Sequence, residues 1–316
     1  MKPKEQPSEK KTLTYILDDF LATFQASTTR RTYKGTMKAF FDALEWNLMT
    51  ITELKKMPFT DLTRKVNGFL DSIKRTDPST GRIANARTYN RKRNTLSSFF
   101  AYLERVHDHV KNPLVLFPMV KLTKKSTTAS MTENEVKRFL DHMKSKTAET
   151  KTGHRDYLIL VCLSLLALRR QEAASLRWDG INWQTHSITV IQKGGTEKRL
   201  PLPHDLLKLL KAQYQRHTGT YLFQSTRRSK IKHDRPISTS SIYRLIRDTG
   251  EELFPGRGIT PHSLRKSFIE RALDQKIDLV SIMNATGHKS LEMIQYYDTR
   301  DVLSRNAVHG MARLLK

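Results

Sequence analysis

The sequence predicts a mainly α-helical protein with one small β-sheet, divided into an amino-terminal helical domain and a mixed α/β domain. Three observations support this prediction. Apolar residues recur at helical spacing through most of the 316 residues. Residues 118–130 hold few large apolar side chains and many Lys, Ser and Thr, which is typical of a linker. Residues 186–191 alternate in polarity and residues 198–202 return after a glycine-rich turn, which indicates a β-hairpin.

The expected first domain covers residues 1–117 and contains four helices. Their apolar residues fall at helical spacing around residues 13–24, 33–44, 62–73 and 96–106, and the last of these helices begins near Arg87. Ser27, Thr28 and Thr29 are the candidates to cap the second helix. A turn-rich stretch over residues 77–81 separates the third helix from the fourth.

The expected second domain covers residues 131–316, after the linker 118–130. Thr132 and Glu135 have the spacing of a capping box at the start of its first helix. An apolar run indicates a buried helix, and a short helix follows it. These two and the later helices are expected over residues 157–168, 170–177, 205–214, 240–254, 262–274, 279–284 and 291–297.

The charge of the chain indicates a polyanionic partner. Lys and Arg number 56 against 31 Asp and Glu, which gives a net charge of +25. Nucleic acid is the usual partner of so basic a protein, with a membrane-surface or ribosomal role as the alternatives. Four basic residues gather at the start of the fourth helix, and contact with DNA phosphates is favoured over an ordinary solvated face. These candidate DNA-binding residues are Arg87, Arg91, Lys92 and Arg93.

Several other classes of protein are disfavoured. The single cysteine, Cys162, excludes an intramolecular disulfide framework and a Cys-rich zinc site. The apolar run over 157–168 is too short for a bilayer span, and the polar amino terminus lacks the apolar segment of a signal peptide. We therefore expect a cytoplasmic protein without a membrane partner. Neither a nucleotide-binding loop nor a metal motif is found, so no metal and no cofactor are expected.

Four separated segments carry groups suited to attack on a phosphodiester. They are residues 168–172 (LRRQE), Lys193 in the hairpin turn, residues 261–265 (PHSLR), and Gly287-His288 followed by Tyr297. In this order and spacing, the segments resemble those of the tyrosine recombinase, or phage integrase, family, which includes Xer- and Cre-like enzymes. The resemblance covers residues 131–316. The helical first domain and its exit at Asn112-Pro113 are similar to the family's core-binding domain.

The resemblance implies a C-shaped clamp that closes on double-stranded DNA at a specific recombination site. It implies strand cleavage and rejoining through a 3′-phosphotyrosine intermediate and a Holliday junction, without cofactor or ATP. Integration, excision and chromosome-dimer resolution all stay open. The family assembles as a tetramer on DNA, which allows a monomer free in solution. A terminal segment over 302–315 is expected to dock into a neighbouring protomer, with packing on its own domain as the alternative.

Two arginines match the pair that the family uses to bind the scissile phosphate. Catalysis on a phosphodiester needs fixed cations at the non-bridging oxygens, and a planar guanidinium binds phosphate through two parallel hydrogen bonds. Arg169 and Arg265 are these residues. For Arg169 the alternative is a salt bridge to Glu172, and for Arg265 it is DNA-backbone binding alone. Glu172 resembles the family's acidic residue and is assigned to orienting the site.

The remaining catalytic candidates come from the same matches. Lys193 corresponds to the family's hairpin lysine, the general acid for the departing 5′-oxygen, and Lys198 is its nearest rival. His262 and His288 correspond to two histidines able to donate to the phosphate, and His262 could also accept the tyrosine proton. Both could instead be structural.

Tyr297 is the expected nucleophile and Tyr296 is its competitor. The family's spacing from histidine to tyrosine favours Tyr297. A phenol has an unperturbed pKa of about 10, so neighbouring cations must assist its attack. The chain departs from the family pattern at Ala167, where Gly is usual, and at Lys266, where His is common. A type IB topoisomerase and a non-catalytic helix-turn-helix protein using residues 278–297 are the rival interpretations.

Overall fold

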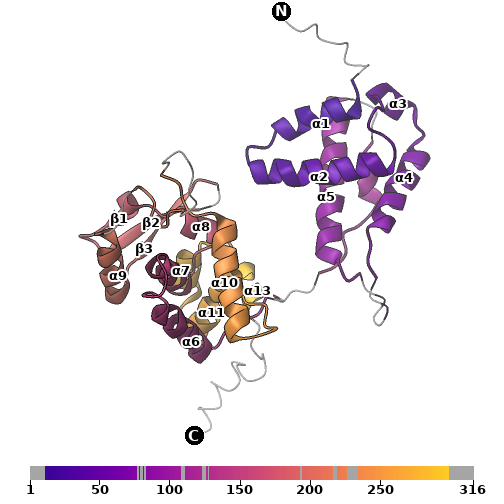
Figure 1. The fold of residues 1–316 in the computed structure, drawn as a ribbon. Coiled ribbons are helices and arrows are strands. Elements are labelled where there is room, and N and C mark those ends of the chain that lie inside the picture. Colours follow the sequence, from indigo (N-terminus) through magenta and orange to yellow (C-terminus); the bar gives the residue numbers. More distant parts are fainter. Residues whose placement is uncertain are drawn as a thin grey trace, which may run out of the picture. The chain divides into compact units, whose positions relative to one another are not determined.

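The computed structural model divides the chain into two compact units, Met1–Thr123 and Lys124–Lys316 (Figure 1). The division falls inside the segment 118–130. The structure describes residues 11–76, 78, 81, 83–107, 111–122, 126, 128–192, 194–215, 219–225 and 234–298. Its mainly helical fold with one small sheet confirms the predicted fold class. No helix among the described residues is both long and apolar enough to cross a membrane.

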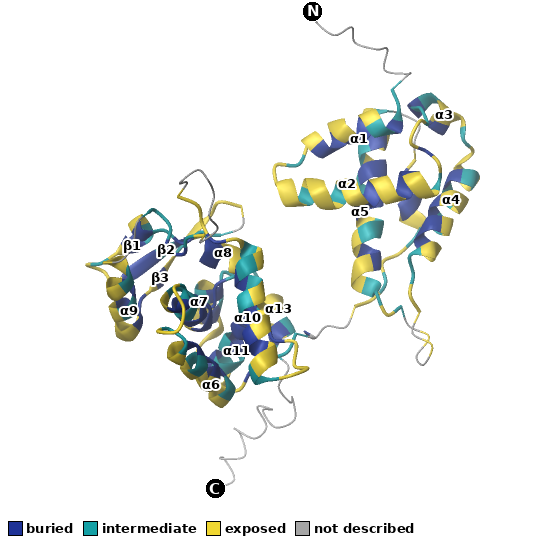
Figure 2. Cartoon of the chain, viewed as in Figure 1, coloured by how far each residue is buried: buried dark blue, intermediate teal, exposed yellow. Residues whose placement is uncertain are grey.

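The first unit is built from helices alone among its described residues. They are α1 Leu13–Ala22, α2 Ser27–Ala43, α3 Ile51–Lys56, α4 Phe59–Ser72, α5 Ala86–Val106 and the 3-10 helix η2 Pro113–Leu116. Apolar faces of α1, α2, α4 and α5 meet in a core rich in aromatic rings. Phe40 lies at its centre, with its ring 5.5 Å from Trp46 and 5.1 Å from Phe69. Figure 2 shows the buried stripe along each helix.

Two details of the first unit differ from the sequence prediction. Ser27 is the first residue of α2, and the N-cap is Ala26, which makes no side-chain cap hydrogen bond. The expected caps at Ser27–Thr29 are therefore wrong, because these three residues are already part of the helix. Helix α3 was not expected, since six residues are too few for a periodic pattern; a capping box between Thr50 and Glu53 starts it.

The second unit surrounds a buried central helix, α7. Its helices are α6 Glu133–Ser145, α7 Gly153–Leu165, α8 Arg170–Ala174, η3 Trp178–Gly180, α9 His204–Tyr214, α10 Thr239–Leu253, α11 Pro261–Asp274, α12 Leu279–Thr286 and α13 Leu291–Tyr297. Helices α6, α8, α9, α10 and α11 all contact α7. The capping box of Thr132 and Glu135 is present at the start of α6. Residues of α7 such as Ile159, Leu160 and Leu163 are fully buried because other elements pack around the middle of the helix.

The sheet is antiparallel, in the order β1 Ile181–Asn182, β2 Ser187–Ile191 and β3 Glu197–Pro201. The predicted hairpin corresponds to β2 and β3, and the two-residue β1 is too short for any pattern to reveal. In the register, Ile188 faces Leu200 and Val190 faces Lys198. Because side chains alternate between the two faces, Lys198 projects from the same face as these three buried apolar residues.

Candidate active site

The junction between α7 and α8 sets the first arginine of the site. Ala167 has a φ of +49°, a left-handed conformation that ends the preceding helix and redirects the chain. Arg169 then becomes the N-cap of α8, and its backbone N–H donates to Glu172 Oε2 at 2.9 Å. Its guanidinium Nη1 donates to Glu172 Oε1 at 2.8 Å. Glu172 is 2% exposed and binds one edge of the Arg169 guanidinium. The Arg169 side chain itself is one third exposed.

Arg265 on α11 is fully buried, at 0% exposure. Its Nη1 donates to the Ala167 carbonyl and its Nη2 donates to the Thr286 carbonyl. Its Nε has no hydrogen-bond partner among the described residues. Burial, and then the charge of Arg169, lowers the pKa of Arg265 to about 10, so the group is still charged at neutral pH. The fold therefore supports this cation from two segments and leaves its buried Nε unpaired.

His288 follows α12 after Gly287, whose φ of +68° closes that helix. Arginine only donates, so Nε2 of His288 accepts from Arg265 Nη2 at 3.0 Å. The hydroxyl of Thr286 donates to the Ile282 carbonyl, so it accepts from His288 Nδ1 at 3.1 Å. Burial, followed by the nearby cations, lowers the pKa of His288 to about 3. The ring is neutral and orients Arg265, with both nitrogens occupied inside the protein.

Tyr297 lies against both histidines. Its ring stacks on His288 with centroids 5.4 Å apart and meets His262 edge-on at 6.2 Å. The side chain is buried, at 5% exposure, and desolvation raises its pKa while the charges of Arg265 and Arg169 lower it. Tyr296 is half-buried and its carbonyl accepts a hydrogen bond from the Ser126 N–H. The ring contacts to both histidines described here are made by Tyr297.

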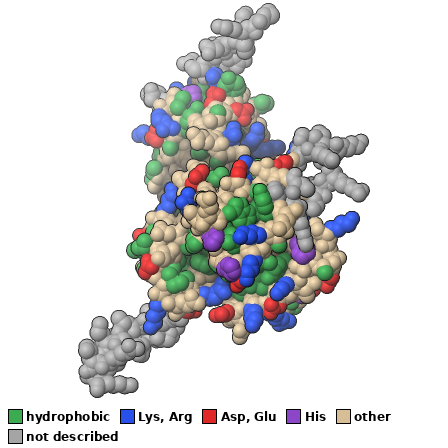
Figure 3. All heavy atoms as spheres, turned by 90° about the vertical axis from the view of Figure 1, so that its left-hand side faces the viewer, with side chains coloured by type: hydrophobic (Ala, Val, Ile, Leu, Met, Phe, Trp, Pro, Cys, Tyr) green, Lys and Arg blue, Asp and Glu red, His purple; other side chains and the backbone are tan. Residues whose placement is uncertain are grey.

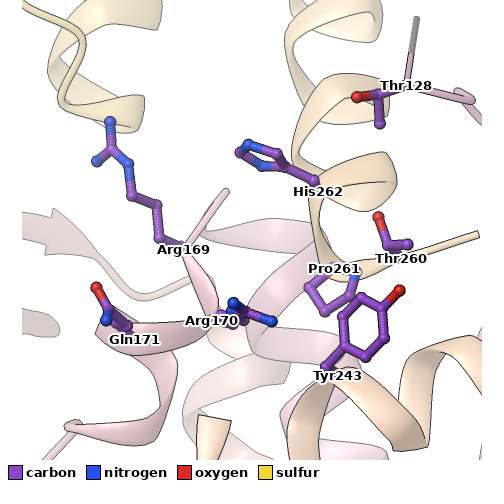
Figure 4. Close-up of a pocket in the computed structure, with 8 residues that line it drawn as sticks. All are labelled: Thr128, Arg169, Arg170, Gln171, Tyr243, Thr260, Pro261 and His262. Carbon is purple, nitrogen blue, oxygen red and sulfur yellow. The ribbon is translucent and has the colours of Figure 1, made fainter. Parts of the chain in front are cut away.

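A pocket of about 470 Å³ opens beside this cluster. Figure 4 shows Arg169 and His262 extending into it from α8 and α11, with the side chains of Arg170 and Tyr243 near each other below. The Arg170 guanidinium lies 5.6 Å from the centre of the Tyr243 ring. Desolvation, and then the charges of Arg265, Arg169 and Arg170, lowers the pKa of His262, which favours a neutral ring able to accept a proton.

The structure brings six of the sequence-predicted site residues together in the second unit. Arg169, Glu172, Arg265, His288 and Tyr297 lie together, and His262 borders them at the pocket. Lys193 and the segment 302–315 lie outside the described residues. The four basic residues Arg87, Arg91, Lys92 and Arg93 are on α5 of the first unit.

The four basic residues of α5 are not equivalent. Arg87 and Arg91 are exposed, and Lys92 is half-buried. Arg93 donates from Nε to the Phe117 carbonyl at 2.8 Å and from Nη2 to the Leu114 carbonyl. Its guanidinium therefore ties α5 to η2. DNA contact by these residues stays a prediction, and Arg87 and Arg91 are the members best placed for it.

Two further lysines were not assigned to the site from the sequence, and both are largely buried. Lys198 lies 3.7 Å from Glu172 Oε2 and donates to the Ala285 carbonyl at 2.9 Å. Lys266, at a position where His is common in the family, donates to the Thr128 carbonyl at 2.9 Å. No sequence pattern predicts that these two lysines are buried, because their burial depends on tertiary packing. Figure 3 shows Lys, Arg and His side chains beside apolar ones on one face of the second unit.

Comparison with known proteins identifies the family. The model of the phage integrase family matches residues 129–302. The chain belongs to the phage integrase family. It is similar to the tyrosine recombinase XerA of Pyrococcus furiosus, with 30% identity over 64% of this chain and 66% of that protein, just under two thirds. It is similar to the tyrosine recombinase XerD of Staphylococcus epidermidis strain RP62A, with 23% identity over 89% of this chain and 92% of that protein.

Solved structures agree on the fold. A λ integrase dimer bound to a core site matches with a TM-score of 0.65 and 20% identity, over 95% of this chain and 80% of that one. The XerH recombinase bound to its difH substrate also matches with a TM-score of 0.65, at 19% identity, over 91% of this chain and 79% of that one. The predicted enzyme class, a tyrosine site-specific recombinase, is confirmed. The relatives favour neither a type IB topoisomerase nor a non-catalytic regulator.

Proposed function

We propose that this recombinase cuts and rejoins double-stranded DNA at a specific site through a 3′-phosphotyrosine bond made by Tyr297. One observation carries the proposal: Tyr297 stacks on His288, which in turn accepts a hydrogen bond from the buried guanidinium of Arg265. The cluster thus contains a phenol, two histidines and two arginines, which come from four separate segments of the chain. Arg169 and Lys198 are paired with a single carboxylate, Glu172, and Arg265 adds a third cation nearby, so the described cluster has an excess of positive charge that complements a phosphodiester.

In the proposed cleavage step, the Tyr297 oxygen attacks the scissile phosphorus and forms an O–P bond. The bond from phosphorus to the 5′-oxygen breaks, and the leaving strand ends in a 5′-hydroxyl. His262 accepts the phenol proton, and Lys193 donates a proton to the leaving oxygen. Arg169 and Arg265 bind the non-bridging oxygens, where charge grows in the transition state. A 5′-hydroxyl of the partner strand reverses these bond changes, so rejoining needs no external energy.

The assembly is also part of the proposal. Exposed Arg87 and Arg91 on α5 would bind DNA phosphates, and the two units would close around the duplex as a clamp. Four protomers would form a ring on paired sites, with the segment 302–315 of each docked on its neighbour, because repeated head-to-tail contacts close into rings. Exchange between the sites would pass through a Holliday junction. A cytoplasmic location stays a prediction.

The test is the formation of a protein–DNA adduct that resists SDS on a nicked substrate, from which the cleaved fragment diffuses away. Wild-type protein should accumulate the adduct. Tyr297→Phe should bind the same DNA but form none, because the nucleophilic oxygen is gone. Tyr296→Phe is the matched control and should retain adduct formation. Full adduct formation by Tyr297→Phe would refute the assignment of the nucleophile.

A further inference from the structure

Lys198 is a buried lysine at the edge of the site. It lies on β3 opposite Val190, on the face of the sheet that carries Ile188 and Leu200. Its side chain is 9% exposed. Lysine is almost never buried to this extent unless its charge is paired, because desolvating an ammonium is costly. Burial among apolar neighbours therefore requires an explanation from the polar groups at its tip.

Two contacts satisfy the Lys198 ammonium, and each leads to one of the phosphate-binding arginines. On one side the ammonium is 3.7 Å from Glu172 Oε2, and the other oxygen of Glu172 binds Arg169. On the other side it donates to the Ala285 carbonyl at 2.9 Å. The next residue, Thr286, accepts from Arg265 through its carbonyl. One ammonium thus links α8 to the end of α12.

We propose that Lys198 is a positioning residue, whose ammonium fixes the spacing between the Glu172–Arg169 pair and the end of α12 so that both arginines meet one phosphate. This role rests on the proposed function. It assigns Lys198 a task different from proton donation, because the side chain is largely buried and its ammonium is held between Glu172 and the Ala285 carbonyl. Misplacement of a catalytic group by about 1 Å can cost about 100-fold in rate, so a fixed spacing has a large effect.

The charge of Lys198 is part of the role. Three charged groups face the Lys198 ammonium: Glu172 in α8, Arg169 at the N-cap of α8, and Arg265 in α11. The titratable ring of His288, which is neutral, faces it from the end of α12. Burial lowers the pKa of Lys198 to about 8, Glu172 raises it, and the two arginines lower it further. The ammonium is therefore charged at neutral pH and loses its proton in mildly alkaline solution. Once Lys198 is neutral, Arg169 is the one cation among the described residues that is still paired with Glu172.

A change of leaving group separates positioning from proton donation. In a DNA substrate whose scissile 5′-oxygen is replaced by sulfur, the leaving thiolate needs no proton, so a missing general acid no longer matters. Lys198→Met removes the charge while nearly preserving the volume. It should slow cleavage about 100-fold on the oxygen substrate and by the same factor on the sulfur substrate. Lys193→Ala is the control, and the sulfur substrate should restore its rate.

Two results would overturn the inference. If the sulfur substrate restored the cleavage rate of Lys198→Met, Lys198 would be the general acid. If Lys198→Met cleaved both substrates at the wild-type rate, Lys198 would have no role in cleavage. Failure of the proposed function can be distinguished from both results, because wild-type protein would then form no DNA adduct through Tyr297.

A second measurement covers the case in which Lys198→Met does not fold. On the sulfur substrate, wild-type cleavage should fall as the pH rises past about 8, the pKa of Lys198. In Lys198→Arg that decline should move to higher pH, because arginine keeps its proton. An unchanged alkaline decline in Lys198→Arg would also overturn the inference, and a purely structural role would not shift this profile.

Discussion

The two units of the chain bury different kinds of residues. Among the described residues of the first unit, the buried polar side chains are uncharged, namely Thr36, Asn90, Thr95 and Asn112. The second unit buries ionisable residues, namely Glu172, Arg265, Lys266 and His288. Burial of a charge is costly unless partners compensate it, so a fold retains such groups mainly where they serve a purpose. This difference is the one expected if the second unit binds a phosphate, as proposed above, and the core of the first unit serves stability alone.

Removal of the most buried charge should give the largest effect. Arg265→Ala should lower cleavage about 1,000-fold, because it deletes a cation at the transition-state oxygens. It also leaves the carbonyls of Ala167 and Thr286 without their donor. DNA binding should persist, since the exposed basic residues are intact. Measurement of single-turnover cleavage beside DNA binding checks this.

A change in the apolar core of the first unit is the matched contrast to Arg265→Ala. Phe40→Leu should cost a small amount of stability and leave the cleavage rate of the folded enzyme near that of wild type. If Arg265→Ala cleaved as fast as Phe40→Leu, the contrast between the two cores would lose its meaning.

The pH dependence of stability should reveal the buried histidine. The pKa of His288 is about 3 in the folded chain and about 6.5 in an unfolded one. The unfolded chain therefore binds more protons between these values, so stability is fully present above pH 6.5 and is lost as the pH falls toward 3. From pH 6.5 to 5 the loss from this ring is about 2 kcal/mol. In His288→Gln the free energy of unfolding should therefore fall less between pH 6.5 and 5 than it does in wild type. An equal fall in the two proteins would exclude a buried neutral ring at His288.

The smallest predicted effect concerns Ala167. A left-handed conformation strains a residue with a Cβ by roughly 1 kcal/mol, and glycine adopts it freely. In Ala167→Gly the relief of this strain is largely offset by the greater entropy of glycine in the unfolded chain, so the free energy of unfolding should change by less than about 0.5 kcal/mol. Ala173→Gly, inside α8, is the control and should lower it by about 1 kcal/mol. Chemical denaturation measures both, and a loss in Ala167→Gly as large as that in Ala173→Gly would contradict the strain.

The sequence predicts the helices of the second unit well, because long apolar patterns survive in the structure. The expected helix over 262–274 is α11, which starts one residue earlier at Pro261. Tertiary contacts are harder to predict from the sequence. The burial of Arg265 depends on a contact with Thr286, 21 residues away. The contact of Lys198 with the Ala285 carbonyl joins residues that are 87 positions apart. The family spacing supplies Arg169 and Tyr297 as site residues, and the salt bridge between Arg169 and Glu172, raised from the sequence as an alternative for Arg169, is present in the structure.

Identification of the DNA-linked residue tests the central claim most directly. Wild-type adduct can be digested with trypsin, which should leave Tyr296 and Tyr297 on one peptide, because both lie between Lys289 and Arg300. Fragmentation of that peptide in a mass spectrometer should place the phosphate-linked nucleotide on Tyr297. The nucleotide on Tyr296, or on any residue outside this peptide, would contradict the account.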